Sequence, residues 1–269
     1  MKKKFNGKRV RKQRLQFISW AICGRSLNPI FLNACHVDGK NVNFKGCNRS
    51  HKRVFREFGS TTDVDPIFTD SLLKKKIPGT FFAHRHGGLK MFTHGYPDTL
   101  STQGGSARAG YDHWRADYFG TRGLNWKDRI EAVRHFSSWF VDNGITHLVA
   151  DCSDPIRKKV AVKILWEEFG LKMLVSARDY EEGYPPHSPY FSTLDNGIFP
   201  HMSKWISDMA CLELKKGLRQ TAEFILWRCA KTVVRRISTQ NKTRSCFGNL
   251  CKLLKVFRDR KGRACGMVL

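Results

Sequence analysis

The sequence predicts an α/β fold in which helices flank a parallel sheet. Three observations support this prediction. An amphipathic helix is expected over residues 126–144, a short apolar strand follows at 145–152, and a second helix over 156–170 leads into a strand at 172–177. Helices that alternate with short buried strands are typical of βαβ units, whose strands run parallel.

Local sequence sets the ends of these helices. In the first helix Ile130 and Val133 recur near helical spacing, and Asn143-Gly144 ends it. Gly170 ends the second helix, because glycine readily adopts the backbone conformation that terminates a helix.

Other segments complete the expected fold. Residues 80–83 predict a short strand that runs into a glycine turn, and residues 200–237 form a long helical pattern followed by a basic helix over 247–258. The expected organisation has three parts: a basic N-terminal extension, an α/β core and a basic helical C-terminal extension. The corresponding ranges are 1–60, 61–210 and 211–269.

The net charge of +25 lies entirely in the two flanks. Residues 1–59 carry 15 basic and 2 acidic side chains, and residues 204–269 carry 16 basic and 4 acidic ones. The middle, 60–203, has 17 of each and is neutral. Cationic flanks around a neutral core favour a nucleic-acid partner, because Lys and Arg neutralise the phosphate backbone. Solvated surface charge and anionic lipid are the alternatives.

Cysteine content and hydropathy indicate the compartment. The nine cysteines show no framework spacing, which favours free thiols in a reducing, cytoplasmic location. We expect no transmembrane segment, because no apolar run reaches the roughly 18 residues that a membrane span needs. The basic N-terminus lacks the apolar region of a signal peptide.

Charged side chains gather where the strands are expected to end. The segments "YDHWR", "KDR", "SDPIR" and "ARDYEEGY" each carry an arginine close to an acid. In parallel sheets the loops at the carboxyl ends of strands collect ligand groups. Several arginines around one acid suit a phosphate-bearing substrate, although each arginine alone is more simply interpreted as half of a surface ion pair.

The order and spacing of these motifs resemble adenylylsulfate kinase, a P-loop kinase, over residues 77–210. The segment "YDHWR" is similar to that family's Asp-Asn-x-Arg motif, and "GLNWKDRIEAVR" at 123–134 resembles the motif eight residues beyond it. Further along, "SDPIR", "RDYEEGY" and "LDNG" resemble its substrate loop, its lid and a late Leu-Asp-Thr-Gly motif. The resemblance implies a kinase that uses ATP and magnesium.

The resemblance also implies a role for each matching residue. Asp112 would activate a hydroxyl or organise the metal, and Arg115 and Arg129 would bind the substrate anion. Ser153 and Arg157 would belong to the substrate loop. The lid arginine over the nucleotide would be Arg178.

The phosphate loop departs from the family pattern. The motif G-x-x-x-x-G-K-[ST] does not occur, and the nearest segment is "HRHGGLKM" at 84–91. There Gly87, Gly88 and Lys90 are the candidate nucleotide-binding residues, with Lys90 also a candidate catalytic residue. Leu89 replaces a glycine that lets backbone approach phosphate, and Met91 replaces the magnesium-binding hydroxyl. A degenerate kinase fold is therefore favoured over an altered loop that uses Lys90 and its neighbouring histidines.

We expect no resident metal site. The closely spaced histidines His84, His86 and His94 lack a partner pattern and are interpreted as loop residues. Four further candidates have spacings that fit no zinc knuckle, and the thiols among them are interpreted as free. These four are Cys23, Cys35, Cys47 and His51.

Three functions remain open at this point. The first is a P-loop-type phosphotransferase, or an inactive pseudokinase, whose flanks bind nucleic acid. The second is a non-enzymatic nucleic-acid-binding protein on a kinase scaffold. The third is a GNAT-type acyltransferase, with "TRGLNW" in place of its pyrophosphate loop, although the missing glycines oppose it.

Overall fold

The centre of the fold is a five-stranded mixed sheet with strand order β5-β4-β3-β6-β7. The strands are β3 (Cys35–Asn43), β4 (Lys76–His84), β5 (Gly88–Thr93), β6 (His147–Ala150) and β7 (Lys172–Leu174). A computed structural model describes residues 8–24, 26–43, 76–94, 124–151, 154–174, 191–215, 222–239 and 241–261.

The prediction of a parallel sheet was wrong. Strand β3 pairs antiparallel with β4 and β4 pairs antiparallel with β5, whereas β3–β6 and β6–β7 are parallel. The glycine turn after β4 closes a hairpin and leads into β5. The helix α9 (Lys159–Phe169) does connect the parallel strands β6 and β7, so the βαβ unit was predicted correctly.

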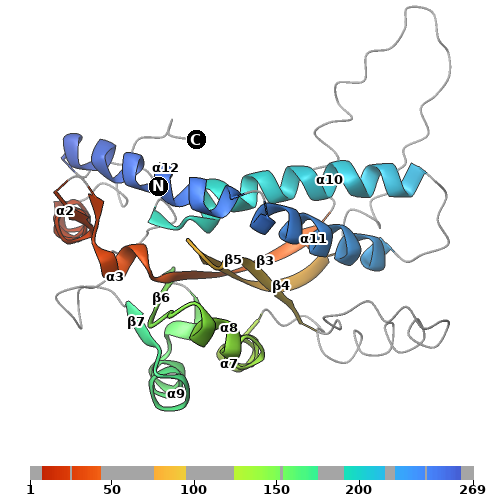
Figure 1. Cartoon of the computed structure of the whole chain (residues 1–269), viewed down its shortest axis with the longest axis horizontal. Helices are drawn as coiled ribbons and strands as arrows, with labels where there is room; N and C mark the ends of the chain where they lie inside the picture. Colours follow the sequence, from red (N-terminus) through yellow and green to blue (C-terminus); the bar gives the residue numbers. More distant parts are fainter. Residues whose placement is uncertain are drawn as a thin grey trace, which may run out of the picture.

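Helices cover both faces of the sheet (Figure 1). One face carries η4 (Leu194–Ile198), α10 (Phe199–Lys215), α11 (Ala222–Thr239) and α12 (Lys242–Asp259). The other face carries α7 (Trp126–His135), α8 (Ser137–Asp142), η2 (Pro155–Arg157) and α9. Beside the sheet lie α2 (Lys8–Ala21), α3 (Pro29–Leu32) and a small pair of strands, β1 (Ile22–Cys23) and β2 (Ser26–Leu27).

Each layer has its own apolar core. Phe81 and Trp227 belong to the core between the sheet and α10–α11, and Phe82 and Phe140 to the core beneath α7–α9. A third core joins α2 and α3 to α12, where Phe17 of α2 and Leu254 of α12 are buried together. The N-terminal and C-terminal segments therefore contact each other through apolar side chains.

The expected helix over 126–144 is broken at Phe136, between α7 and α8. Gly144 and Gly170 adopt positive φ at the ends of α8 and α9, as their positions in the sequence predicted. The expected helical segments over 200–237 and 247–258 correspond to α10, α11 and α12.

The predicted three-part division stays a prediction. Strand β3 lies within residues 1–60, and α11 and α12 lie within 211–269, so the sheet and its covering helices draw on all three parts. Among the described residues, no helix combines the length and hydropathy that crossing a membrane would require.

Candidate active site

Two aspartates occupy matched positions in the register of the neighbouring parallel strands β3 and β6. Strands β3 and β6 are in register with Val37 opposite Ala150, so the next residues are Asp38 and Asp151. Side chains at matched positions of parallel strands point to the same face of the sheet. Asp38 and Asp151 therefore project toward the layer that contains η4 and α12.

A third aspartate reaches the same place from η4. Asp195 lies in this single π-helical turn, which is held over β3 by a hydrogen bond from the backbone N–H of Thr193 to Nδ1 of His36 (3.2 Å). Helix α12 also packs against this turn. The space between Gly197 and Cys246 of α12 is too small for a Cβ atom at position 197. The position of Asp195 thus depends on β3 and on α12.

Burial and neighbouring negative charges raise the pKa values of Asp38 and Asp195. The pKa of Asp38 is raised to about 7, mainly by burial and to a smaller extent by the negative charges of Asp195 and Asp154. The pKa of Asp195 is raised to about 6, mainly by burial and to a smaller extent by the negative charge of Asp151. Like charges that interact in a buried site favour protonation unless a cation neutralises them. Asp38, Asp151 and Asp195, called the acidic cluster below, offer the carboxylate oxygens and negative charge that a divalent cation prefers. Their ligand atoms do not all lie within 4.8 Å of one another, so the side chains must move closer to bind one ion.

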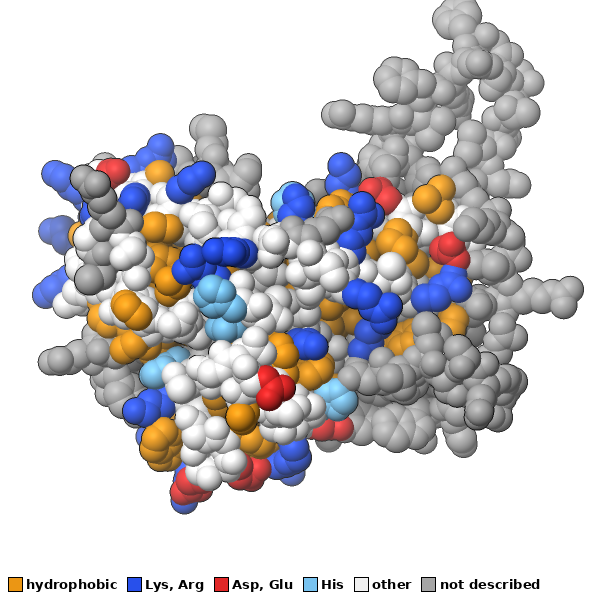
Figure 2. Space-filling model, in the orientation of Figure 1, with side chains coloured by type: hydrophobic (Ala, Val, Ile, Leu, Met, Phe, Trp, Pro, Cys, Tyr) orange, Lys and Arg blue, Asp and Glu red, His pale blue; other side chains and the backbone are white. Residues whose placement is uncertain are grey.

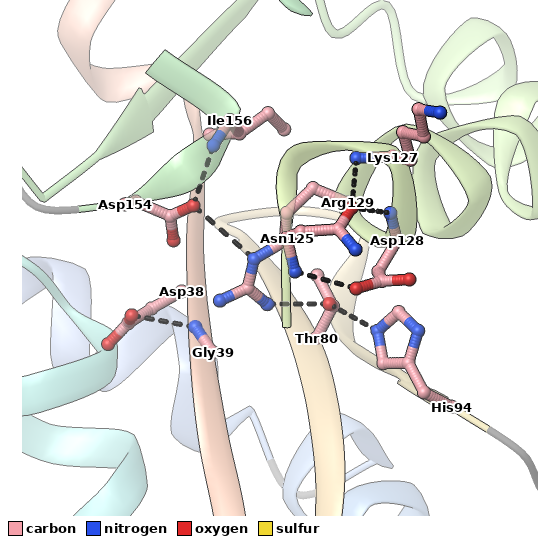
Figure 3. Close-up of polar contacts among 10 residues, drawn as sticks. All are labelled: Asp38, Gly39, Thr80, His94, Asn125, Lys127, Asp128, Arg129, Asp154 and Ile156. Carbon is pink, nitrogen blue, oxygen red and sulfur yellow. Dashed lines mark hydrogen bonds and ion pairs between the residues drawn. The ribbon is translucent and has the colours of Figure 1, made fainter. Parts of the chain in front are cut away.

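A buried arginine supports the acidic cluster from the opposite face of the sheet. The Nε atom of Arg129 lies 3.3 Å from Oδ1 of Asp154, and its NH1 donates to Oγ1 of Thr80 (2.6 Å). Figure 3 shows the guanidinium between these partners, with Asp38 on the side of Asp154. Gly39 makes this possible, because a Cβ atom there would overlap the guanidinium.

The raised pKa of Asp38 predicts how metal-free stability depends on pH. The unfolded chain loses this proton near the ordinary value of 3.8, whereas the folded chain holds it until about 7. The contribution to stability is therefore complete below about pH 4 and is lost as pH rises toward 7.

We expect Asp38→Asn to reduce this loss in thermal unfolding measured with a chelator between pH 4 and 8. The buried histidines contribute to the pH dependence of stability in both proteins, so the difference between the two proteins reports the Asp38 carboxyl group. Equal pH slopes for the two proteins would contradict the assignment.

The candidate phosphate loop is a β-hairpin. Gly87 lies in the turn between β4 and β5, and Gly88 and Lys90 lie on β5. The hydroxyl of Ser238 on α11 accepts from the N–H of Leu89 (2.9 Å) and donates to its carbonyl (2.8 Å). A P-loop instead needs free backbone N–H groups between a strand and a helix. This segment lacks that geometry.

Of the other predicted site residues, the structure describes Arg129 and Arg157. Arg129 is buried on α7, and Arg157 ends η2, which packs against α7. The remaining predictions lie outside the described residues. They concern Asp112, Arg115, Ser153 and Arg178.

Sequence reasoning missed all three members of the acidic cluster. Asp151 lies near the end of the strand predicted over 145–152 and directly follows β6, so the rule that ligand groups gather where parallel strands end could have found it. Asp195 was noticed only as part of "LDNG", and Asp38 lies in a strand whose polar residues obscured the alternation.

The mixed sheet with helices on both faces matches an RNase H-like fold of the type found in transposase catalytic domains. Among solved structures, the chain is similar to the catalytic domain of Mos1 mariner transposase, with a TM-score of 0.53 and 10% identity, over 96% of this chain and 97% of that one. The same domain with raltegravir and manganese gives 0.52 and 8%, over 96% and 98%. A pre-cleavage Mos1 transpososome gives 0.58 and 9%, and there the alignment covers 96% of this chain and 64% of the transposase chain. No protein-family model and no curated protein matches the sequence.

These likenesses correct the sequence-based identification. The resemblance to adenylylsulfate kinase was wrong, because the shared fold is that of a transposase catalytic domain and not a parallel-sheet P-loop kinase. The kinase and GNAT acyltransferase predictions are wrong for the same reason, and ATP has no support.

Proposed function

We propose that the protein is a metal-dependent enzyme that cuts DNA strands and transfers them, with the acidic cluster as its active site. The observation that carries the proposal is that Asp38 and Asp151 occupy matched positions of neighbouring strands, and that Asp195 of a third element interacts electrostatically with both. The fold supports it, because similar solved structures are described as a transposase catalytic domain with magnesium or manganese and as a strand transfer complex.

Magnesium is the cofactor we propose, and Asp38, Asp151 and Asp195 would hold it. When bound, such an ion supplies Lewis acidity toward a phosphodiester and favours deprotonation of an attacking hydroxyl. The carboxylates contribute position and negative charge. Lys40 interacts with both Asp195 and Asp38. Burial lowers the pKa of Lys40, and the negative charges of these two aspartates oppose that shift and favour the positively charged form.

The two basic flanks support DNA as the partner, because they meet in the fold. Helix α2 has five basic and no acidic side chains, and α12 has five basic and one acidic. The two helices contact each other, and α12 also packs on η4, which carries Asp195. Figure 2, which has the orientation of Figure 1, shows Lys and Arg side chains on the surface where α12, α10 and α11 run. DNA bound along α2 and α12 would therefore lie close to the acidic cluster.

The proposed activity is tested by cleavage of labelled DNA with magnesium or manganese. We expect Asp151→Asn to reduce cleavage to the level of a reaction with chelator, because the exchange removes a charged ligand and leaves the size of the side chain almost unchanged. Asp142→Asn, an exposed exchange on α8, is the matched control and should keep full activity. Cleavage that survives Asp151→Asn, or that needs no divalent metal, would refute the proposed site.

The DNA-binding surface is tested separately by salt titration. Arg244 and Lys252 are exposed on α12, and replacing both with glutamine should lower the slope of log affinity against log salt by about 2, or roughly 0.9 for each phosphate that is no longer neutralised. Lys159 and Lys163 are exposed on α9, which covers the opposite face of the sheet (Figure 1), and the same double exchange there is the control. An equal reduction in both double variants would contradict a specific role for α12.

We also propose that the protein functions inside the cell. Four cysteines in the described part of the chain are free thiols, which suits a reducing compartment.

A further inference from the structure

A second group of metal-ligating side chains lies at the end of β5 and the first turns of α7. His94, Asp128 and Glu131 each offer one ligand atom, and these atoms lie within 4.8 Å of one another. Asp128 and Glu131 are three residues apart on α7, so both side chains lie on one face of the helix. His94 directly follows β5 and reaches the group from the sheet.

His94 has one ring nitrogen with a partner and one without. Its Nε2 lies 2.8 Å from Oγ1 of Thr80, an oxygen that already accepts from NH1 of Arg129. Its Nδ1 is buried and has no hydrogen-bond partner among the described residues. Figure 3 shows the imidazole next to the carboxylate of Asp128. Buried polar atoms are nearly always paired, so this nitrogen indicates a missing ligand.

The surrounding contacts suit metal binding at Nδ1. Metal-binding histidines usually donate their other N–H to a neighbouring acceptor, and Thr80 can accept that bond from Nε2. Burial, together with the charge of Arg129, lowers the pKa of His94 to about 3, so the ring is neutral as a ligand must be. Asp128 uses Oδ2 to cap α7 through Asn125, which leaves Oδ1 for a cation.

We propose that His94, Asp128 and Glu131 bind one zinc-class divalent ion that joins the end of β5 to α7. One imidazole and two carboxylates suit zinc or a similar first-row metal better than magnesium, which prefers all-oxygen sites. Bonds of about 2.0–2.1 Å in a tetrahedral site place ligand atoms roughly 3.3 Å apart, so the side chains must close by up to about 1.5 Å. Side-chain rotation at the exposed Glu131 can supply part of that movement.

This site is distinct from the acidic cluster. Arg129 lies between them, with Asp154 on one side and Thr80 and His94 on the other (Figure 3). The inference does not depend on the proposed nuclease activity, because it concerns a metal that holds two elements together.

The test is calorimetric titration of the metal-free full chain with zinc and, separately, with magnesium. All proteins carry Asp38→Asn and Asp151→Asn, which removes binding at the acidic cluster. We expect one zinc site whose affinity falls at least 10-fold with Glu131→Gln and with Asp128→Asn, and little magnesium binding. Glu167→Gln, an exposed exchange on α9, is the control.

Thermal unfolding provides a second measurement. Zinc should raise the melting temperature of the parent and of Glu167→Gln, and the rise should shrink in Glu131→Gln, a mild exchange that should not impair folding. Zinc affinity that is the same in Glu131→Gln and the parent would overturn the proposal. Binding confined to the protein's thiols would give that result. Preference for magnesium over zinc would overturn the assigned metal class.

Discussion

Replacing Arg129 with methionine is expected to destabilise the protein by about 3–5 kcal/mol, since it leaves Asp154 buried without its cation. Arg129 and Asp154 are both almost fully buried, and the ion pair between them lies between α7 and η2. Burial already raises the pKa of Asp154, and the guanidinium opposes that shift. The measurement is denaturant unfolding of the two proteins at pH 7.

An arginine on the same helix provides the control. Arg134 pairs with Glu168 at 2.8 Å, but both side chains are largely exposed. Exposed ion pairs contribute little, so Arg134→Met should cost no more than about 1 kcal/mol. If the two variants lose equal stability, the buried pair does not hold α7 against η2 as described.

The exchange Gly197→Ala is expected to reduce DNA cleavage by about 10²-fold, because a displacement near 1 Å in a catalytic group has effects of that size. A Cβ atom at Gly197 would lie 2.5 Å from Sγ of Cys246, so η4 or α12 must move. Asp195 lies two residues away in the same turn. Overpacking of this kind also costs about 1–3 kcal/mol of stability.

Two further variants distinguish displacement from a general effect of alanine. Cys246→Gly removes the atoms nearest to the added methyl group, so the double variant should regain part of the activity. Gly248→Ala places a methyl group in open space on α12 and should leave cleavage unchanged. Failure of Cys246→Gly to restore any activity would show that contact with α12 does not position Asp195.

The elements that could be predicted from sequence are those with strong local signals. Helices α7 to α12 have apolar stripes at helical spacing, and two of them end at glycines with positive φ. The parallel pair β6 and β7 followed from the helix between them. These features depend on residues close together in the chain, so periodicity and end signals identify them.

The sheet order and the site depended on contacts that local patterns do not reveal. The central strand β3 reads "CHVDGKNVN", and its polar residues hid a strand that is covered on both faces. Those same residues include Asp38, so the function of the strand obscured its structure. The arginine-rich motifs were overinterpreted, since Arg129 contacts Asp154 and Thr80 inside the protein.

The link between β3 and η4 has a consequence for synthesis of the chain. The bond from Thr193 to His36 joins residues 157 positions apart, and the turn is completed by packing against α12, still later in the sequence. Domains in which partners are so distant form late, when most of the polypeptide has left the ribosome. A nascent chain therefore has Asp38 and Asp151 long before Asp195 is fixed, and on the proposed function it acquires the ability to cut DNA only after α12 has been synthesised.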